Sequence, residues 1–120
     1  MFLGFELMPT NEEWADEIIQ VYIDLRCQEN DIVFLTYKDL AIRLGRPGQE
    51  RLLARPLDIV REECQKRQIP DVATMVVSKE SLVGGEVKPS TKAASKYNDW
   101  TSLRQEQARA ISFDWKTYKD

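Results

Sequence analysis

The chain has 120 residues, of which 42% are hydrophobic and 31% are charged, and its net charge is -3. This balance is typical of one compact domain and excludes a disordered tail or a membrane protein. The sequence contains no histidine, so histidine-dependent triads and zinc hydrolases are excluded as well.

A long helix is predicted near the start of the chain. The first nine residues, MFLGFELMP, lack a basic flank and hold too few apolar residues for a signal peptide, so we expect a cytoplasmic protein. Thr10 and Glu13 then have the spacing of a capping box, which predicts a helix from about Asn11 to Gln28, ended by Asn30–Asp31. Its inward stripe would consist of Trp14, Ile18, Val21, Tyr22 and Leu25.

The next segment predicts a short strand followed by helices. IVFL, residues 32–35, is either a strand or an extended connection into the core. Thr36 with Asp39 resembles a second cap, opening a helix that ends at Gly45 with Leu40 and Leu44 facing inward. Another helical stretch begins at Gln49, and Pro56 predicts a kink or two consecutive helices there. Its inward stripe is Leu53, Leu57, Val60 and Cys64.

Strand and turn residues dominate the following part. VATMVV, residues 72–77, is rich in β-branched residues and predicts a strand. Turn residues at 78–81 and the pair Gly84–Gly85 predict a β-hairpin or wing after it. KPSTKAASK, residues 88–96, is small, polar and basic, which is typical of a mobile loop.

The chain closes with one more predicted helix. Asn98 or Asp99 caps it, and its weak inward face would be Trp100, Leu103, Gln107 and Ile111. Phe113 and Trp115 are expected to pack back against the body. We therefore expect a single domain with an N-terminal helix in 1–30, a core over 32–86, a mobile loop over 87–97, and a C-terminal helix and aromatic tail over 98–120.

The sequence carries no recognisable catalytic constellation. Cys27 and Cys64 lie in helical contexts without a CxxC partner, which predicts reduced, partly buried thiols, with Cys64 in the core. No spacing of carboxylates, lysines, tyrosines or thiols stands out. We expect a protein that is not an enzyme and that needs neither a cofactor nor a metal.

The core segment has the pattern of a winged helix-turn-helix, because two short helices around a glycine turn precede the predicted strand pair. Thr36–Tyr37, Leu40–Ala41, Gly45, Pro47 and Arg51 resemble the TYxxLAxxxGxPxxxR run of the alkylguanine-DNA alkyltransferases and alkyltransferase-like proteins. Ile69–Pro70, Val76–Val77 and Gly84–Gly85 fall roughly where that family has its IPCHRVV segment and following glycines. The likeness covers about residues 32 to 86. The fold class expected is α+β, a mainly helical winged helix-turn-helix with a small β-hairpin wing and a C-terminal helix.

The resemblance implies roles for two residues and denies one activity. Tyr37 would position a phosphate of the target nucleotide, and Arg51 would enter the base stack as that nucleotide flips. Where the family has Pro-Cys-His-Arg, this chain has Pro70 followed by Asp71, Val72 and Ala73, so alkyl transfer is excluded. Asp71 would either line a shallow pocket or cap a turn. Glu50 places a carboxylate beside Arg51, where it would repel phosphate.

The distribution of charge adds to the DNA hypothesis. Residues 1–35 hold eight acids and one base, whereas residues 36–68 hold five acids and eight bases. We therefore expect a non-enzymatic, catalytically dead relative of the alkyltransferases that binds duplex DNA. The candidate contacts are Tyr37, Arg43, Arg46, Gln49, Arg51, Arg55, Lys79 and Lys88, with Lys92 and Lys96 as further lysines on or after the wing.

Two other interpretations stay open. The arginines also fit a solvated helix face paired with Glu50, Asp58 or the acidic first helix, and Tyr37 also fits a packed ring with a solvated hydroxyl. Alternatively, the protein is an acidic protein-binding module, such as an immunity, anti-defence or regulatory inhibitor, directed at a basic nucleic-acid-acting protein. Its contact residues would be Glu12, Glu13, Asp16, Glu17 and Asp24.

Overall fold

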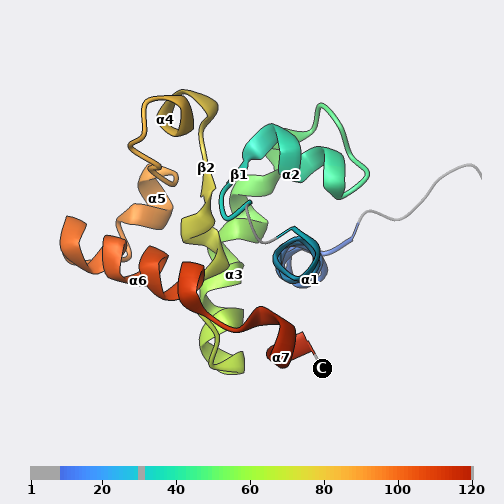
Figure 1. Ribbon diagram of the computed structural model, residues 1–120. Coiled ribbons are helices and arrows are strands. Elements are labelled where there is room, and N and C mark those ends of the chain that lie inside the picture. Colours follow the sequence, from blue (N-terminus) through green and yellow to red (C-terminus); the bar gives the residue numbers. More distant parts are fainter. Residues whose placement is uncertain (1–8, 30–31, 120) are drawn as a thin grey trace, which may run out of the picture.

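The computed structural model describes residues 9–29 and 32–119, and these form a mainly helical α+β fold with one small sheet (Figure 1). The elements in chain order are α1 (Asn11–Gln28), β1 (Leu35–Thr36), α2 (Tyr37–Arg43), the 3-10 helix η1 (Glu50–Leu53), α3 (Ala54–Arg67), the 3-10 helix η2 (Val72–Met75), β2 (Val76–Val77), α4 (Lys79–Val83), α5 (Thr91–Ala94), α6 (Trp100–Ser112) and α7 (Trp115–Lys119). No helix in the described ranges is long and apolar enough to cross a membrane.

Helix α1 begins at the predicted capping box. The Thr10 amide donates to Glu13 Oε1 at 2.8 Å, and the Glu13 amide donates to Thr10 Oγ1 at 3.1 Å. Glu29 is the C-cap of the helix, and the predicted stop at Asn30–Asp31 lies outside the described residues. The bounds predicted for this helix, Asn11 to Gln28, are therefore confirmed. Its start was predictable because hydrogen bonds between residues three positions apart determine it.

Helix α3 runs through the middle of the molecule and packs against α1 (Figure 1). The predicted stripe is buried as expected, with Leu53, Leu57, Val60 and Cys64 all in the core. The break appears as two consecutive helices, since η1 passes into α3 at Ala54 and Pro56 lies in the first turn of α3. Proline is tolerated there because the first amides of a helix have no intrahelical partner.

The sheet joins two distant segments in parallel, with Leu35 opposite Val76 and Thr36 opposite Val77. The prediction of a strand over all of 72–77 is wrong for its first four residues, which form η2. The Asp71 side chain accepts from the Ala73 amide at 3.0 Å, and the Thr74 hydroxyl donates to the Asp71 carbonyl at 2.8 Å. These local hydrogen bonds turn the chain and compete with an extended conformation.

The predicted β-hairpin wing is also wrong, because its residues form helix α4. The Ser78 hydroxyl accepts from the Ser81 amide at 3.1 Å and so caps a helix instead of closing a turn between strands. Gly84 and Gly85 end that helix. The partner of the Val76–Val77 strand is β1, which lies 41 positions earlier in the register.

The segment expected to be a loop over 87–97 contains helix α5, and α5 packs on α3. Its lysines reach one residue of α3. Lys92 Nζ lies 2.6 Å from Asp58 Oδ2, and Lys96 Nζ donates to the Asp58 carbonyl at 2.8 Å. The basic residues of this segment are therefore partly used to fasten it to the core.

Helix α6 is capped by Asp99, whose side chain accepts from the Ser102 amide at 2.7 Å. Leu103, Gln107 and Ala110 form its buried face. The prediction that Trp100 and Ile111 face inward is wrong, because they are 46% and 42% exposed. Phe113 and Trp115 pack against the body as expected, because Trp115 belongs to the hydrophobic core, Phe113 packs against that core, and the ring centroids of Trp115 and Tyr22 lie 5.3 Å apart. Helix α7, which starts at Trp115, was not predicted.

Buried Arg26 fastens α1 to the end of α6. Its Nη1 donates to the Tyr22 hydroxyl at 3.1 Å and to the Ala110 carbonyl at 2.9 Å, and its Nη2 donates to the Ile111 carbonyl at 2.9 Å. The last carbonyls of a helix have no intrahelical partner, so the guanidinium supplies donors that they need and complements the helix dipole.

We expect the substitution Arg26→Met to lower the free energy of unfolding by about 2 kcal/mol, because it removes the guanidinium bonds to both carbonyls of α6. The Ile111 carbonyl loses this donor, whereas the Ala110 carbonyl keeps the indole donor of Trp115. Urea unfolding followed by circular dichroism measures the loss. The control is Arg109→Met on the exposed face of the same helix, where the ion pair with Glu106 contributes little. Equal stability of the two variants would show that Arg26 does not hold the helices together.

Candidate nucleic-acid interface

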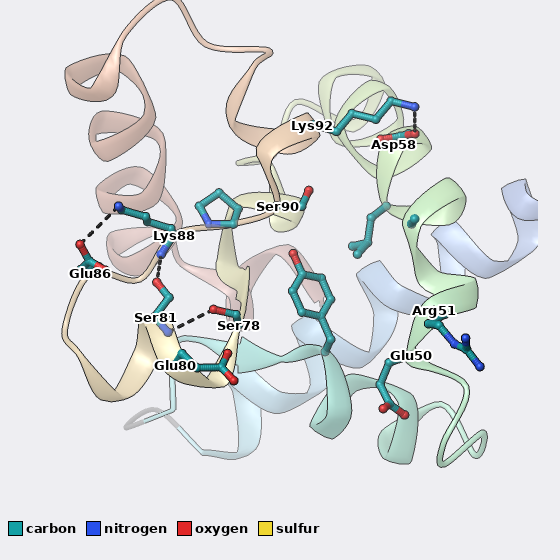
Figure 2. A pocket seen from close by; sticks show the side chains of 14 residues that line it. Glu50, Arg51, Asp58, Ser78, Glu80, Ser81, Glu86, Lys88, Ser90 and Lys92 are labelled. Atoms are coloured by element: carbon teal, nitrogen blue, oxygen red, sulfur yellow. Dashed lines mark hydrogen bonds and ion pairs between the residues drawn. The ribbon is translucent and has the colours of Figure 1, made fainter.

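A hollow of about 610 Å³ lies beside the start of α2 and η1 (Figure 2). It is bounded by the N-terminal ends of α2 and α4, by η1 and the first turns of α3, and by the chain between α4 and α5. Its lining residues are Tyr37, Glu50, Arg51, Ala54, Leu57, Asp58, Ser78, Glu80, Ser81, Glu86, Lys88, Pro89, Ser90 and Lys92. The hollow therefore joins both halves of the segment that carries the alkyltransferase resemblance.

Local caps and the sheet position the hydroxyl groups of this hollow. Thr36 caps α2 by accepting from the Asp39 amide at 3.1 Å, and Ser78 caps α4. Because Thr36 pairs with Val77 in the sheet, the next residues of the two strands, Tyr37 and Ser78, enter the same hollow. Ser81 Oγ accepts from the Lys88 amide and so closes the wall on the far side.

Tyr37 presents a neutral hydroxyl to the hollow. Burial raises the pKa of the phenol above its usual value, and hydrogen bonding to Ser90 opposes this shift. The hydroxyl therefore keeps its proton at neutral pH and is able to donate to an anionic oxygen. The ring is half-buried against the core, and the hydroxyl lies in the hollow next to Ser90.

Arg51 and Arg55 are exposed at the start of the second helical stretch. Within the described residues, neither side chain forms a hydrogen bond or an ion pair. Figure 2 shows the Arg51 guanidinium pointing away from the 610 Å³ hollow. Both arginines also line a neighbouring hollow of about 420 Å³ that reaches Trp14 of α1. The start of the second helix thus carries two cations open to solvent.

The other two candidate arginines contact α1. Arg43 Nη2 lies 3.6 Å from Glu29 Oε2, with both side chains largely exposed. Arg46 places its guanidinium 5.4 Å from the centre of the Trp14 ring, a cation–π contact. These contacts agree in part with the alternative interpretation, in which the arginines pair with the acidic first helix. Gln49, in the turn between them and η1, is exposed.

The candidate lysines lie on two sides of α4. Lys79 lines a further hollow of about 610 Å³ together with Tyr37 and Glu50. Lys88 Nζ lies 3.3 Å from Glu86 Oε2. Lys88 is therefore partly neutralised, whereas Lys79 is exposed and unpaired within the described part of the chain.

Carboxylates also border the first hollow. Asp58 is engaged by Lys92, and Glu86 by Lys88. Glu50 is half-buried, and its Oε1 has no hydrogen-bond partner in the described structure. Glu50 and Glu80 would therefore oppose the entry of an anionic ligand into this hollow.

The acidic residues of α1 are divided between ion pairs and solvent. Asp16 Oδ1 lies 2.7 Å from Arg67 Nη2, and Asp24 Oδ1 lies 2.7 Å from Lys119 Nζ. Glu13 serves the capping box. Glu12 and Glu17 are exposed and have no partner among residues 9–29 and 32–119.

Asp71, at the position of the nucleophile in the resembling family, lies away from the first hollow. It borders a second hollow of about 390 Å³ and does cap η2. Its Oδ2 accepts from the Tyr97 hydroxyl at 2.7 Å, while its amide donates to Glu106 Oε2 at 2.7 Å. Arg61 places its guanidinium 5.5 Å from the centre of the Tyr97 ring. Sequence analysis singled out only Asp71 of this cluster, because the other members come from separate segments that no local pattern connects.

Comparison with known proteins identifies no relative for this arrangement. No protein-family model, no curated protein and no solved structure matches the chain significantly. Within the described residues, no three or more cysteine, aspartate or glutamate side chains group in a way that could hold a metal ion. The case for a function therefore depends on the residues of the site and on the motif resemblance.

We expect Cys64 to resist thiol reagents in the folded protein. Its side chain is fully buried, and burial raises the pKa of the thiol to about 12, so the reactive thiolate is scarce at neutral pH. Titration with a disulfide reagent at pH 7 should label Cys64 only after denaturant is added. A Cys27→Ser variant makes the readout specific, and rapid labelling of Cys64 in that folded variant would contradict the expectation.

We expect Asp71 to make the protein less stable as the pH rises. Burial raises the pKa of Asp71, while hydrogen bonds from Tyr97 and Ala73 oppose the shift. Between the usual value of about 3.9 and this raised value, the folded state holds a proton that the unfolded chain has released, so stability falls with rising pH. Urea unfolding at several pH values should show a smaller fall for Asp71→Asn.

The control for this measurement is Asp114→Asn. Hydrogen bonds from Thr117 lower the pKa of Asp114, so this carboxylate stabilises the fold above its unfolded pKa and loses that effect as the pH falls. The two variants should therefore differ from the natural protein with opposite dependence on pH. The same dependence for both would contradict the assignment to Asp71.

Proposed function

We propose that this protein binds duplex DNA without acting on it as an enzyme, and that α2 with η1 and α3 forms its helix-turn-helix. The observation that carries the proposal is the pair Arg51 and Arg55, exposed and unpaired within the described chain at the start of the second helix. In helix-turn-helix proteins the residues at that position contact base edges in the major groove. Guanidinium groups bind both guanine edges and phosphates.

The connection between the helices fits this motif. Gly45 and Gly48 have φ values of 78° and 83°, which side-chain-bearing residues rarely adopt. The turn therefore depends on glycine at both positions, and it sets α2 against the start of η1. Helix α2 would cross the DNA backbone while η1 and the first turn of α3 approach the groove.

Supporting phosphate contacts come from α2 and from the chain around α4. The Tyr37 hydroxyl is protonated at the start of α2 and is a donor suited to a phosphate oxygen. Lys79 and Lys88 would take the place of wing contacts, although they are carried by α4 and the segment after it. Nonspecific binding through such cations weakens steeply with salt.

The resemblance to the alkyltransferases and alkyltransferase-like proteins supports the same assignment. Its two halves lie side by side, because Thr36 pairs with Val77 in the sheet and Tyr37 directly follows Thr36. The residues that would make the protein an alkyl acceptor are absent, since Asp71 follows Pro70 and the Cys64 thiol is buried and protonated. We infer a binding protein that has the DNA-contacting part of the motif alone.

Binding of a basic protein through α1 is the second candidate. Exposed Glu12 and Glu17 favour it, whereas the ion pairs of Asp16 and Asp24 reduce the charge available on that face. We place it second because Arg51 of η1 and Arg55 in the first turn of α3 have no such internal partners in the described chain. Charge reversal at Glu12 and Glu17 would abolish co-purification of a basic partner under this hypothesis and leave DNA binding intact.

We expect the Arg51→Ala variant to bind duplex DNA about tenfold more weakly than the natural protein, with a shallower dependence of affinity on salt. The measurement is fluorescence anisotropy of a labelled duplex titrated at several salt concentrations. Lys66→Ala is the matched control, because Lys66 is an exposed cation in the last turn of α3, the helix that continues from η1. It should bind like the natural protein.

Two outcomes would overturn the proposal. One is the absence of duplex binding by the natural protein at low salt and micromolar concentration. The other is an equal loss of affinity in the Arg51 and Lys66 variants, which would mean that overall charge and not the start of η1 decides binding.

A further inference from the structure

Trp100 is the most conspicuous exposed aromatic residue outside the interface described above. It is the first residue of α6, and 46% of it is exposed. The Arg104 guanidinium carbon lies 4.5 Å from a ring centroid of its indole, and Lys88 Nζ lies 5.7 Å from one. Trp100, Arg104, Lys88, Gly85 and Glu86 line a hollow of about 440 Å³. A partly exposed indole with two cations over its ring forms one wall of a surface cavity.

Arg104 keeps its positive charge beside the ring. Its Nη1 donates to Gln107 Oε1 at 2.7 Å, and its Nη2 donates to the Glu86 carbonyl. Both acceptors are neutral, and no carboxylate of the described residues forms an ion pair with Arg104. The one carboxylate in the hollow, that of Glu86, is paired with Lys88 at 3.3 Å. The guanidinium is thus oriented by hydrogen bonds without being neutralised.

A buried amide fixes the wall of this cavity. Gln107, 2% exposed, donates through Nε2 to the Thr74 carbonyl at 3.0 Å and to the Val87 carbonyl at 2.8 Å. Val87 has a φ of 44°, a conformation that β-branched residues rarely adopt. Its strained backbone is held from α6 on one side and by the Ser81 carbonyl on the other. The indole and its cations therefore sit on a preorganised support.

The cavity continues from the proposed DNA interface. Lys88 and Glu86 line both this hollow and the hollow that contains Tyr37 and Arg51. Figure 2 shows Lys88 and Arg51 on opposite sides of that first hollow. A nucleic-acid strand that leaves the duplex near Arg51 and follows Lys88 would reach Trp100.

We propose that Trp100 is a stacking platform for an unpaired nucleotide of a DNA strand whose duplex part is bound at Arg51 and Arg55. The inference rests on the proposed function and names its substrate class, duplex DNA with an adjoining single-stranded stretch. Bases within a duplex already stack on one another, so an exposed indole is useful only to a base released from pairing. Arg104 and Lys88 add cationic contacts for the phosphates of that nucleotide.

The test compares a blunt duplex with the same duplex bearing a short oligothymidine extension, at the 3′ or the 5′ end in separate arms. Stacking of one base on an aromatic side chain should strengthen binding of an extended duplex about tenfold over the blunt one. Trp100→Ala should remove this gain, and Trp100→Phe should keep part of it because a phenyl ring still stacks. Tyr118→Ala, which removes another exposed aromatic residue, should keep the full gain.

Intrinsic fluorescence gives an independent readout. Trp14 and Trp115 are 4% and 2% exposed, so quenching by an extended duplex reports mainly on Trp100. Trp100→Phe should abolish the quenching while its circular dichroism spectrum stays that of a folded helical protein.

The outcomes separate this inference from the proposed function. Binding of the blunt duplex with no gain from either extension, or a gain that persists in Trp100→Ala, overturns the stacking platform alone. Failure to bind any duplex, blunt or extended, overturns the proposed function and the platform with it.

Discussion

The candidate site depends on a very short piece of parallel sheet. Leu35 pairs with Val76 and Thr36 with Val77, and helices α2 and α4 begin where these two strands end. Because parallel strands point the same way, α2 and α4 both begin at the same end of the sheet (Figure 1). Each of them is capped by a side-chain hydroxyl, that of Thr36 for α2 and that of Ser78 for α4. The pairing thereby brings together two segments that the sequence separates by about forty residues, and no other described contact joins these two helix starts so directly.

The arginines around α2, η1 and the start of α3 differ in whether they contact α1 and its C-cap. Arg43 and Arg46 meet Glu29 and Trp14 of that helix, and the acidic face of α1 is in turn partly occupied by Arg67 and Lys119. What remains open to solvent is the start of the next helical stretch. A protein with a net charge of -3 can present a local positive tip in this way, because the bulk of its negative charge is spread elsewhere.

The sequence predicted those parts of the fold that short-range interactions determine. The capping residues Thr10, Thr36 and Asp99 each specify a helix start within three residues, and all three caps are present. The prediction of a wing was wrong because the turn residues after Val77 suit a capped helix as well as a hairpin. Only the distant partner strand decides between the two. The buried face of α6 was predicted wrongly for a related reason, because distant contacts decide it. Ala110 is buried beside Arg26 and Trp115, whereas the bulkier Ile111 is exposed.

The site itself was only partly readable. The motif spacing placed Tyr37 and Arg51 among the candidates, and Lys88 was a candidate as a lysine after the predicted wing. The structure places all three in the lining of one hollow. The pairing of Asp71 with Tyr97 and the cations around Trp100 depend on how α6 lies against the chain after α4, which no local pattern encodes. The Gln107 amide nitrogen donates to the carbonyls of both Thr74 and Val87, and these two hydrogen bonds couple the packed segments mechanically. One amide ties η2, the segment carrying Lys88 and the helix carrying Trp100 into a single body, so a ligand that displaces any of the three must strain the other two.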